Sequence, residues 1–208
     1  MTIEIVTPNG VISQRVRAAI AKKIKELSFE MKLQKLRDKL ADFLYNKCIT
    51  SEIYASLSGG ILRAEFGLDD YEVSNLNNVV IDIIALTTRI ETSNGAIKII
   101  INFIDDDFDA NKTGTYLYTN RKGESIKIDW LRWLLFEGIN TVVPKSAIYL
   151  KPGRGRSEMA IMITPKSGGS YSVDEQFSGT DVDNWITRMV KWNKAEIIKI
   201  IKDTLDAA

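Results

Sequence analysis

Residues 129–138, DWLRWLLFEG, constrain the fold of this 208-residue chain most strongly. They hold two of its four tryptophans and almost no polar character. Read as a helix capped by Asp129 and ended by Gly138, the segment presents apolar side chains around most of its circumference. Burying one large apolar side chain stabilises a fold by roughly 1.5–3 kcal/mol. We therefore expect this segment, with Trp130 and Trp133, to anchor the core and to be covered on nearly all sides.

A long helical pattern over residues 11–48 follows the turn Pro8-Asn9-Gly10. Apolar residues recur there in one stripe at steps of three to five residues, which is typical of an amphipathic helix. The stripe comprises Ile12, Val16, Ile20, Ile24, Leu27, Met31, Leu36, Leu40 and Leu44. An unbroken helix of this length would span roughly 55 Å, more than a domain of this size needs to cover its core. We expect part of it to project or to pack on a neighbouring molecule.

Two short helices and a longer one are predicted next. A helix capped by Ser51 ends at Gly59 and Gly60, which allow a sharp change of direction. A second short helical turn covers residues 62–66. A helix over residues 73–85 then has an apolar side formed by Leu76, Val79, Val80, Ile83 and Ile84.

Alternating apolar residues predict antiparallel hairpins in the second half of the chain. The turn Ser93-Asn94-Gly95 between two such runs is a strong hairpin signal. The strands at 115–119 and 125–129 would extend the same antiparallel sheet toward the helix at 129–138. The other predicted strands are 87–91, 96–104, 147–150, 158–164 and 171–173.

The chain closes with two predicted helices. Thr180 and Asp183 form a capping-box pattern before an apolar stripe of Val182, Trp185, Ile186, Met189 and Val190. A final helix over 194–205 lies within a C-terminal helical extension, residues 193–208. The sequence thus predicts an α+β fold in a single domain, residues 1–208. It would comprise the long N-terminal amphipathic helix, a small antiparallel sheet of hairpins, flanking short helices and C-terminal helices.

Composition restricts the function classes. With 28 basic and 27 acidic residues, the overall charge gives no reason to expect a nucleic-acid or membrane partner, so any electrostatic partner must act locally. No apolar run approaches the roughly 18 residues of a membrane-spanning helix, and no signal-peptide pattern is present. The single Cys48 cannot form an intrachain disulfide, so we expect a reducing compartment. The absence of histidine disfavours acyl-transfer chemistry.

An acidic cluster raises the question of a metal site. Hard cations such as Mg²⁺ bind several carboxylate oxygens, which a nuclease could use. The cluster consists of Asp105, Asp106, Asp107 and Asp109. Its spacing does not fit an EF-hand loop, because the glycine and the distal glutamate are missing. A solvated acidic loop is the simpler interpretation, and we expect neither a metal nor a cofactor.

The loop at residues 152–156, PGRGR, could bind a phosphate group through Arg154 and Arg156. It lacks the Lys-Ser/Thr ending of a P-loop and does not lead into a helix, which disfavours nucleotide binding. A salt-dependent contact with DNA or with an acidic protein surface stays open for this loop.

Charge is distributed unevenly along the chain. Residues 11–48 contain ten basic and four acidic residues, a net charge of +6, and the simplest interpretation is a solvated face. Residues 69–124 contain ten acidic and five basic residues, a net charge of −5. Opposite charges on two surfaces suit head-to-tail association, and heterologous contacts that close on themselves form rings.

Four segments together resemble virion proteins of tailed bacteriophages, in particular neck or tail-completion proteins. They are SLSGGILRAEFGL (56–68), IDWLRWLLFEG (128–138), GRGRSEMAIMI (153–163) and FSGTDVDNWITRMV (177–190). Proteins of this kind also begin with a long helix, followed by a small antiparallel sheet and flanking helices. The acidic stretch 105–112 and the helix after Trp192 depart from the pattern, and either could serve a phage-specific contact.

The resemblance implies a non-enzymatic structural subunit that forms a homo-oligomeric ring at the head-to-tail junction or at the tail end. Its partners would be copies of itself and neck, connector or tail proteins, with passing contact to DNA in the channel and none to a membrane. It would reside in the virion, and in the host cytoplasm during assembly. Another tail or baseplate component is one alternative, and a metal-dependent DNA-processing enzyme is another.

The resemblance also implies roles for individual residues. The turn after the long helix would be shaped by Gly59, Gly60, Leu62 and Arg63. An exposed loop facing a partner or the channel would hold Arg154 and Arg156. The packing of the C-terminal helix would involve Asn184, Trp185 and Arg188, and the two tryptophans Trp130 and Trp133 would form the fixed core of the subunit.

Overall fold

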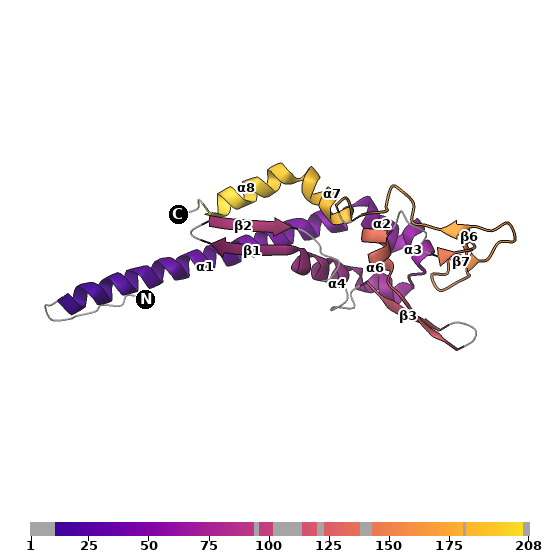
Figure 1. Cartoon of the computed structure of the whole chain (residues 1–208), viewed down its shortest axis with the longest axis horizontal. Coiled ribbons are helices and arrows are strands. Elements are labelled where there is room, and N and C mark those ends of the chain that lie inside the picture. Colours follow the sequence, from indigo (N-terminus) through magenta and orange to yellow (C-terminus); the bar gives the residue numbers. More distant parts are fainter. Residues whose placement is uncertain are drawn as a thin grey trace.

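The computed structural model describes residues 11–93, 96–101, 114–119, 123–137, 143–180 and 182–205. It has the mixed α+β architecture that the sequence predicts: a long N-terminal helix, antiparallel hairpins and C-terminal helices (Figure 1). The acidic cluster at 105–109, the turns at 8–10 and 120–122, and the residues Asn94, Gly95 and Gly138 lie outside the described residues. No described helix has both the length and the apolar character that crossing a membrane requires.

Helix α1, Val11–Ile49, has a buried face in its C-terminal half. The apolar residues Leu33, Leu36, Leu40, Leu44 and Cys48 are buried there, between the other helices. Toward the N-terminus Leu27 and Met31 are 54% and 74% exposed. In Figure 1 this part of α1 extends past α8 and the β1–β2 hairpin.

The apolar stripe of α1 changes sides along the helix, so the prediction of a single stripe is wrong. Met31 precedes Leu40 by nine residues, about two and a half turns at 3.6 residues per turn. These two residues therefore face opposite sides of the helix. The change occurs at the five-residue step from Met31 to Leu36, which rotates the stripe by about 140°.

Three helices follow, α2 (Glu52–Gly59), α3 (Ile61–Phe66) and α4 (Asp70–Thr87). The Ser51 hydroxyl caps α2 by accepting a hydrogen bond from the Tyr54 amide at 3.2 Å, as predicted. Helix α4 begins earlier than the sequence prediction, because Asp69 and Glu72 form a capping box. The predicted apolar side of α4 is buried against α1 and the rest of the core.

The strands form four separate two-stranded antiparallel sheets among the described residues, not one extended sheet as expected. The pairs are β1 (Thr88–Ser93) with β2 (Ala96–Ile101), β3 (Tyr116–Thr119) with β4 (Ser125–Ile128), β5 (Val143–Pro144) with β8 (Ser170–Tyr171), and β6 (Ala147–Leu150) with β7 (Ala160–Ile163). The β1–β2 hairpin lies beside α1, whereas the β3–β4 and β6–β7 ribbons extend from the opposite end of the molecule (Figure 1). The β1–β2 hairpin contacts α1 and α4, whereas β7 contacts α3 and β6 contacts β8 of the neighbouring pair.

The segment 129–137 folds as α6 (Trp130–Arg132) and a π-helical turn, η1 (Trp133–Glu137). Trp130, Leu131, Leu134 and Leu135 are buried and Trp133 is half-buried, so the expected cover is confirmed. The predicted cap is wrong, because the Asp129 side chain makes no capping hydrogen bond and lies 2.8 Å from the Lys127 ammonium.

The C-terminal helices are α7 (Trp185–Trp192) and α8 (Lys194–Leu205). The bounds predicted for α8 are confirmed, and it packs against α1, where Lys39 donates to the Thr204 hydroxyl at 3.2 Å. The prediction of Thr180 as the cap of the preceding helix is wrong. Asn184 caps α7 instead, and Val182, predicted on its apolar stripe, lies before the helix and is 86% exposed.

Candidate interaction surfaces

Gly60 lies between α2 and α3 and Gly59 is the last residue of α2, so the change of direction occurs where the sequence predicts it. A Cβ atom at Gly60 would lie 2.8 Å from the Ser56 Cα, so a larger residue would force the two helices apart. At Gly59 the same atom would meet open space. The buried Leu62 donates its amide hydrogen to the Ser56 hydroxyl at 3.1 Å, which fixes the start of α3.

Arg63 connects the end of α2 to the start of α4. Its guanidinium donates to the backbone oxygens of Ser58 and Leu68 and lies 2.7 Å from the Asp70 carboxylate. All of these partners belong to the same chain. Arg63 therefore stabilises the connections from α2 to α3 and from α3 to α4.

Arg156 makes the most extensive polar contacts of the predicted site residues. Its two terminal nitrogens lie 2.7 Å from the two Glu72 carboxylate oxygens, a bidentate arrangement, and one of them lies 2.9 Å from Asp69. It also donates to the Gly67 carbonyl oxygen at 2.9 Å, and its guanidinium carbon lies 4.0 Å from the centre of the Tyr116 ring. This arginine ties the loop after β6 to the start of α4 and to β3.

The environment of Arg156 depends on two backbone positions that favour glycine. Gly67 ends α3 with φ +66°, and a Cβ atom there would lie 3.1 Å from the Tyr116 hydroxyl. Gly155 has φ +73°, and a Cβ atom there would overlap the Ala160 carbonyl. The Tyr116 hydroxyl in turn donates to the Phe66 carbonyl at 2.6 Å, and burial raises the pKa of Tyr116 to about 12.

The two arginines of the PGRGR loop differ in exposure. Arg154 is exposed, whereas Arg156 is half-buried and paired, so the expectation that both face outward holds only for Arg154. A phosphate group could use Arg156 only by displacing Asp69 and Glu72. The sequence could not show this, because both carboxylates lie far from the loop along the chain.

Asn184, Trp185 and Arg188 join α7 to its surroundings. The Asn184 side chain accepts hydrogen bonds from the amides of Ile186 and Thr187, both at 3.1 Å. The buried Trp185 donates from Nε1 to the Ser51 hydroxyl at 3.1 Å, which connects α7 to the start of α2. Arg188 donates to the Ser178 carbonyl at 2.9 Å and lies 3.1 Å from Asp183.

Trp130 and Trp133 both pack near Phe66. The ring centres of Phe66 and Trp130 are 6.0 Å apart, and those of Phe66 and Trp133 are 6.4 Å apart. Cys48 lies at another point of the same core, where its thiol is 3.4 Å from the Met189 sulfur and burial raises its pKa to about 12. These residues are packing groups.

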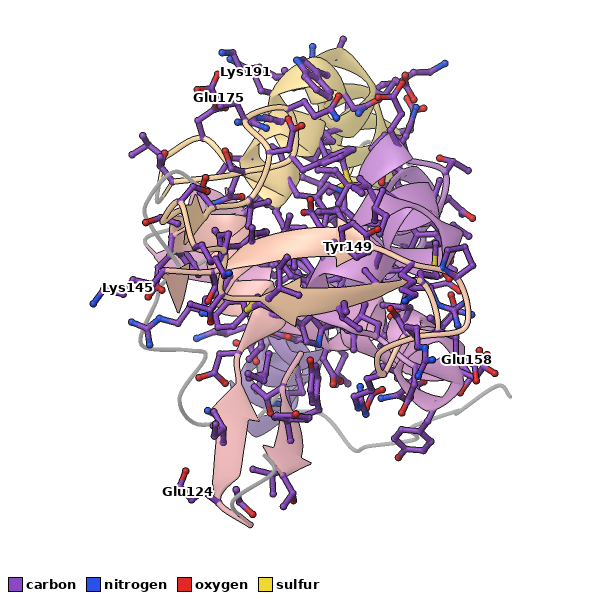
Figure 2. The ribbon with its side chains drawn as sticks, turned by 90° about the vertical axis from the view of Figure 1, so that its right-hand side faces the viewer. Glu124, Lys145, Tyr149, Glu158, Glu175 and Lys191 are labelled. Carbon is purple, nitrogen blue, oxygen red and sulfur yellow. The ribbon has the colours of Figure 1, made fainter. Side chains whose placement is uncertain are left out.

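Sequence reasoning missed a cleft of about 840 Å³ between α3 and the two ribbons β3–β4 and β6–β7. Its walls include the half-exposed Tyr118, Ile126 and Met162. In Figure 2, which views the molecule from this end, Tyr149 lies on the β6–β7 ribbon and Glu124 near the tip of the β3–β4 ribbon. The sequence feature that could have indicated this cleft is the run of apolar residues on both faces of these short strands.

Glu65 also lines this cleft and is partly buried. Burial raises the pKa of its carboxyl, and the nearby Asp174 raises it further. The Tyr171 hydroxyl donates to Glu65 at 3.1 Å, which opposes the increase. The cleft is therefore mainly apolar, with one carboxylate whose charged form is disfavoured.

A second apolar hollow, of about 510 Å³, lies between α1 and α4. Its apolar lining consists of Ala41, Tyr45, Ile81, Ile84 and Ala85. Arg37, Asp42 and Thr88 complete it, and Ile81 is 52% exposed. We call this hollow the α1–α4 groove.

Within the part of the chain that the structure describes, no three His, Cys, Asp or Glu side chains are placed to hold a metal ion. Comparisons with protein-family models, with curated proteins and with solved structures found no match to this chain. The assignment of a function therefore depends on the surfaces described above.

Proposed function

We propose that this protein is a structural, non-enzymatic subunit of a tailed-bacteriophage particle that forms a homo-oligomeric ring at the neck or the tail end. The observation that supports this most is the presence of exposed apolar side chains at both ends of an elongated molecule. Leu27 and Met31 are exposed on the projecting part of α1, and Tyr149, Leu150 and Met162 on the β6–β7 ribbon at the other end (Figure 1). Large exposed apolar patches typically mark sites of protein association.

Two different surfaces at opposite ends favour heterologous contacts, in which one surface of a subunit meets another surface of the next. Such contacts produce a ring when the rotation between subunits closes. The net charges of +6 over residues 11–48 and −5 over residues 69–124 separately favour association between copies, because opposite charges attract.

Among the described residues, two arginines and the cysteine that could suggest chemistry make contacts within the fold. Arg63 and Arg156 are paired with carboxylates, and Cys48 is buried beside Met189. Arg154 remains exposed and is the residue of the PGRGR loop that we assign to contact with a partner or with DNA in the channel.

Imaging of phage particles that lack this protein tests the proposal. Complete heads and tails that fail to join would support a position at the neck, and absent or abnormally long tails would support a position at the tail end. Normal particles would contradict the proposal. A Mg²⁺-dependent DNA cleavage by the purified protein that is lost in the Asp105→Ala and Asp107→Ala variants would contradict its non-enzymatic character.

A further inference from the structure

We propose that residues 2–6 of one copy, TIEIV, dock as a β-strand in the cleft between the β3–β4 and β6–β7 ribbons of a second copy. We call these residues the N-terminal arm. The inference rests on the proposed function and deepens it, because it assigns the two surfaces that meet between neighbouring subunits. The arm precedes the described part of the chain, which begins at Val11, so its sequence is what characterises it.

Two open strand edges border the cleft. Successive side chains of a strand point to opposite faces, so a run of consecutive residues lines a cleft when the edge of their strand faces it. The lining includes the consecutive residues 160–163 of β7 and 126–128 of β4, whereas β6 contributes Ile148. Among the described residues, β4 pairs with β3 and β7 with β6, and neither has a second strand neighbour. Both edges are therefore available for pairing with a further strand.

The outward backbone groups of β7 follow from its pairing with β6. The Lys151 amide donates to the Met159 carbonyl at 2.8 Å, so Met159 directs its hydrogen-bonding groups toward β6. Residues of an antiparallel pair alternate in this respect, so Ala160 and Met162 direct theirs away from β6. Gly155 lies against the Ala160 carbonyl, whereas Met162 is 43% exposed. An unpaired edge of this kind is a template for the addition of a strand.

The N-terminal arm has the composition and the alternation of a strand with one buried face. Four of its five residues are β-branched, which favours extended structure. Ile3 and Ile5 fall on one face of such a strand. The other face carries Thr2, Glu4 and Val6, and so both polar residues of the arm. This alternation is typical of an antiparallel strand that packs one face on a core and turns the other toward solvent.

The cleft offers a matching apolar wall. Its lining from α3 and η1 includes Ala64, Phe66 and Trp133. A docked arm would turn Ile3 and Ile5 toward this wall, which removes apolar surface of both copies from water. The lengths also agree, since five extended residues span about 17 Å and the four residues of β7 about 13 Å. The arm therefore fits the cleft both as a strand and through its apolar face.

The arm that occupies the cleft belongs to a second copy, because it cannot reach the cleft of its own chain. Helix α1 comprises 39 residues and is therefore about 58 Å long. The arm joins its N-terminal end, whereas β3, β6 and β7 lie near its opposite end (Figure 1). The ten residues before Val11 span at most about 36 Å when fully extended. The contact is therefore heterologous, as the proposed ring requires.

Binding of a synthetic peptide tests the contact directly. The peptide comprises residues 1–10 with a fluorophore at its C-terminus, and its receptor is the full-length Ile5→Asp variant, whose own arm is disabled. We expect saturable binding by fluorescence anisotropy. Adding Met162→Asp or Ile126→Asp to the receptor should weaken binding at least tenfold, because both residues line the cleft. Adding Leu117→Asp, at an exposed residue of β3 outside the cleft lining, should leave binding unchanged.

Sedimentation velocity tests the same contact between full-length copies. Ile5→Asp and Met162→Asp should each weaken self-association at least tenfold. Thr2→Asp, which places the same charge on the outward face of the arm, is the matched control and should associate like the natural protein. Ile5→Asp keeps an intact cleft and Met162→Asp an intact arm. An equimolar mixture of these two should therefore form a dimer at a concentration at which each alone is monomeric.

Melting temperatures equal to that of the natural protein would show that the variants are folded, and Ile126→Asp replaces Met162→Asp if the latter does not fold. A peptide that does not bind, or that binds the cleft variants equally well, would overturn the docking inference. Altered variants that associate like the natural protein would do the same. These results leave the proposed function standing, since the copies then meet through other surfaces. A natural protein that is monomeric under all conditions would overturn both.

Discussion

The Arg156 guanidinium and the Glu72 carboxylate form a bidentate ion pair, with both nitrogen–oxygen distances 2.7 Å, across 84 residues of sequence. Glu72 also caps α4 through the Asp69 amide, so one carboxylate joins a helix start to a distant loop. The pair is shielded from solvent on the Glu72 side, where 12% of the side chain is exposed. We regard it as the principal polar contact between the α3–α4 turn and the PGRGR loop.

Replacing Arg156 should therefore destabilise the fold far more than replacing its neighbour Arg154. Hydrogen bonds to charged groups contribute about 1.5–3 kcal/mol, so we expect Arg156→Ala to lower the free energy of unfolding by about that amount. Arg154→Ala, at an exposed position, should change it by at most about 0.5 kcal/mol. Urea denaturation followed by circular dichroism measures both. Equal effects of the two substitutions would show that the ion pair does not stabilise the fold.

Asn184 should be the residue that caps α7. Asn184→Ala removes the acceptor for two backbone amides, which typically costs about 0.5–2 kcal/mol. Thr180→Ala removes one hydrogen bond, from the Asp183 amide at 3.2 Å, and should cost less. Thermal unfolding of both variants compares the two sites. If Thr180→Ala lowers the melting temperature more than Asn184→Ala, Thr180 is the capping residue, as the sequence pattern predicted.

Glu65 should make the stability of the protein depend on pH. Because burial raises the pKa of its carboxyl in the folded state, folding favours the protonated form. The favourable contribution of Glu65 is thus fully present below the ordinary carboxyl pKa and is lost as pH rises through the raised value. Glu65→Gln, which can still accept from Tyr171, should raise the melting temperature at neutral pH and change it little in acid. A variant that is less stable than the natural protein at neutral pH would contradict this assignment.

Cys48 should be inert toward thiol reagents while the protein is folded. Its side chain is fully buried, and burial raises its pKa from 9.0 to about 12, so very little thiolate forms near neutral pH. Labelling with an aromatic disulfide reagent should be negligible in buffer and rapid in urea. Rapid labelling in buffer would show that the contact between α1 and α7 opens frequently.

Local signals account for the parts of the fold that the sequence predicted. The Ser51 cap, the Gly59-Gly60 turn and the alternation of the hairpin strands involve residues within a few positions of each other. The bounds of α8 follow in the same way from helical spacing. Such patterns specify secondary structure because their contacts form within one element or one turn.

The sequence predictions were wrong where two capping patterns overlapped, or where a residue far away in the sequence determines the contacts of a side chain. Thr180–Asp183 and Asn184–Thr187 are adjacent capping patterns, and the buried Asn184 prevails because it satisfies two amides. The single stripe assumed for α1 ignored the rotation at the step from Met31 to Leu36. No pattern around Arg156 could reveal Glu72, and no pattern in α1 could reveal the groove that only packing with α4 creates.

Light scattering by the purified protein over a range of ionic strengths tests the central claim, that this chain forms a homo-oligomeric ring. At low ionic strength and high concentration we predict one discrete mass, a whole-number multiple of the subunit mass greater than two. This mass should fall as salt screens the attraction between the basic helix and the acidic region. A protein that remains monomeric across the whole range, or a mass that grows without limit as in an open polymer, would contradict the account.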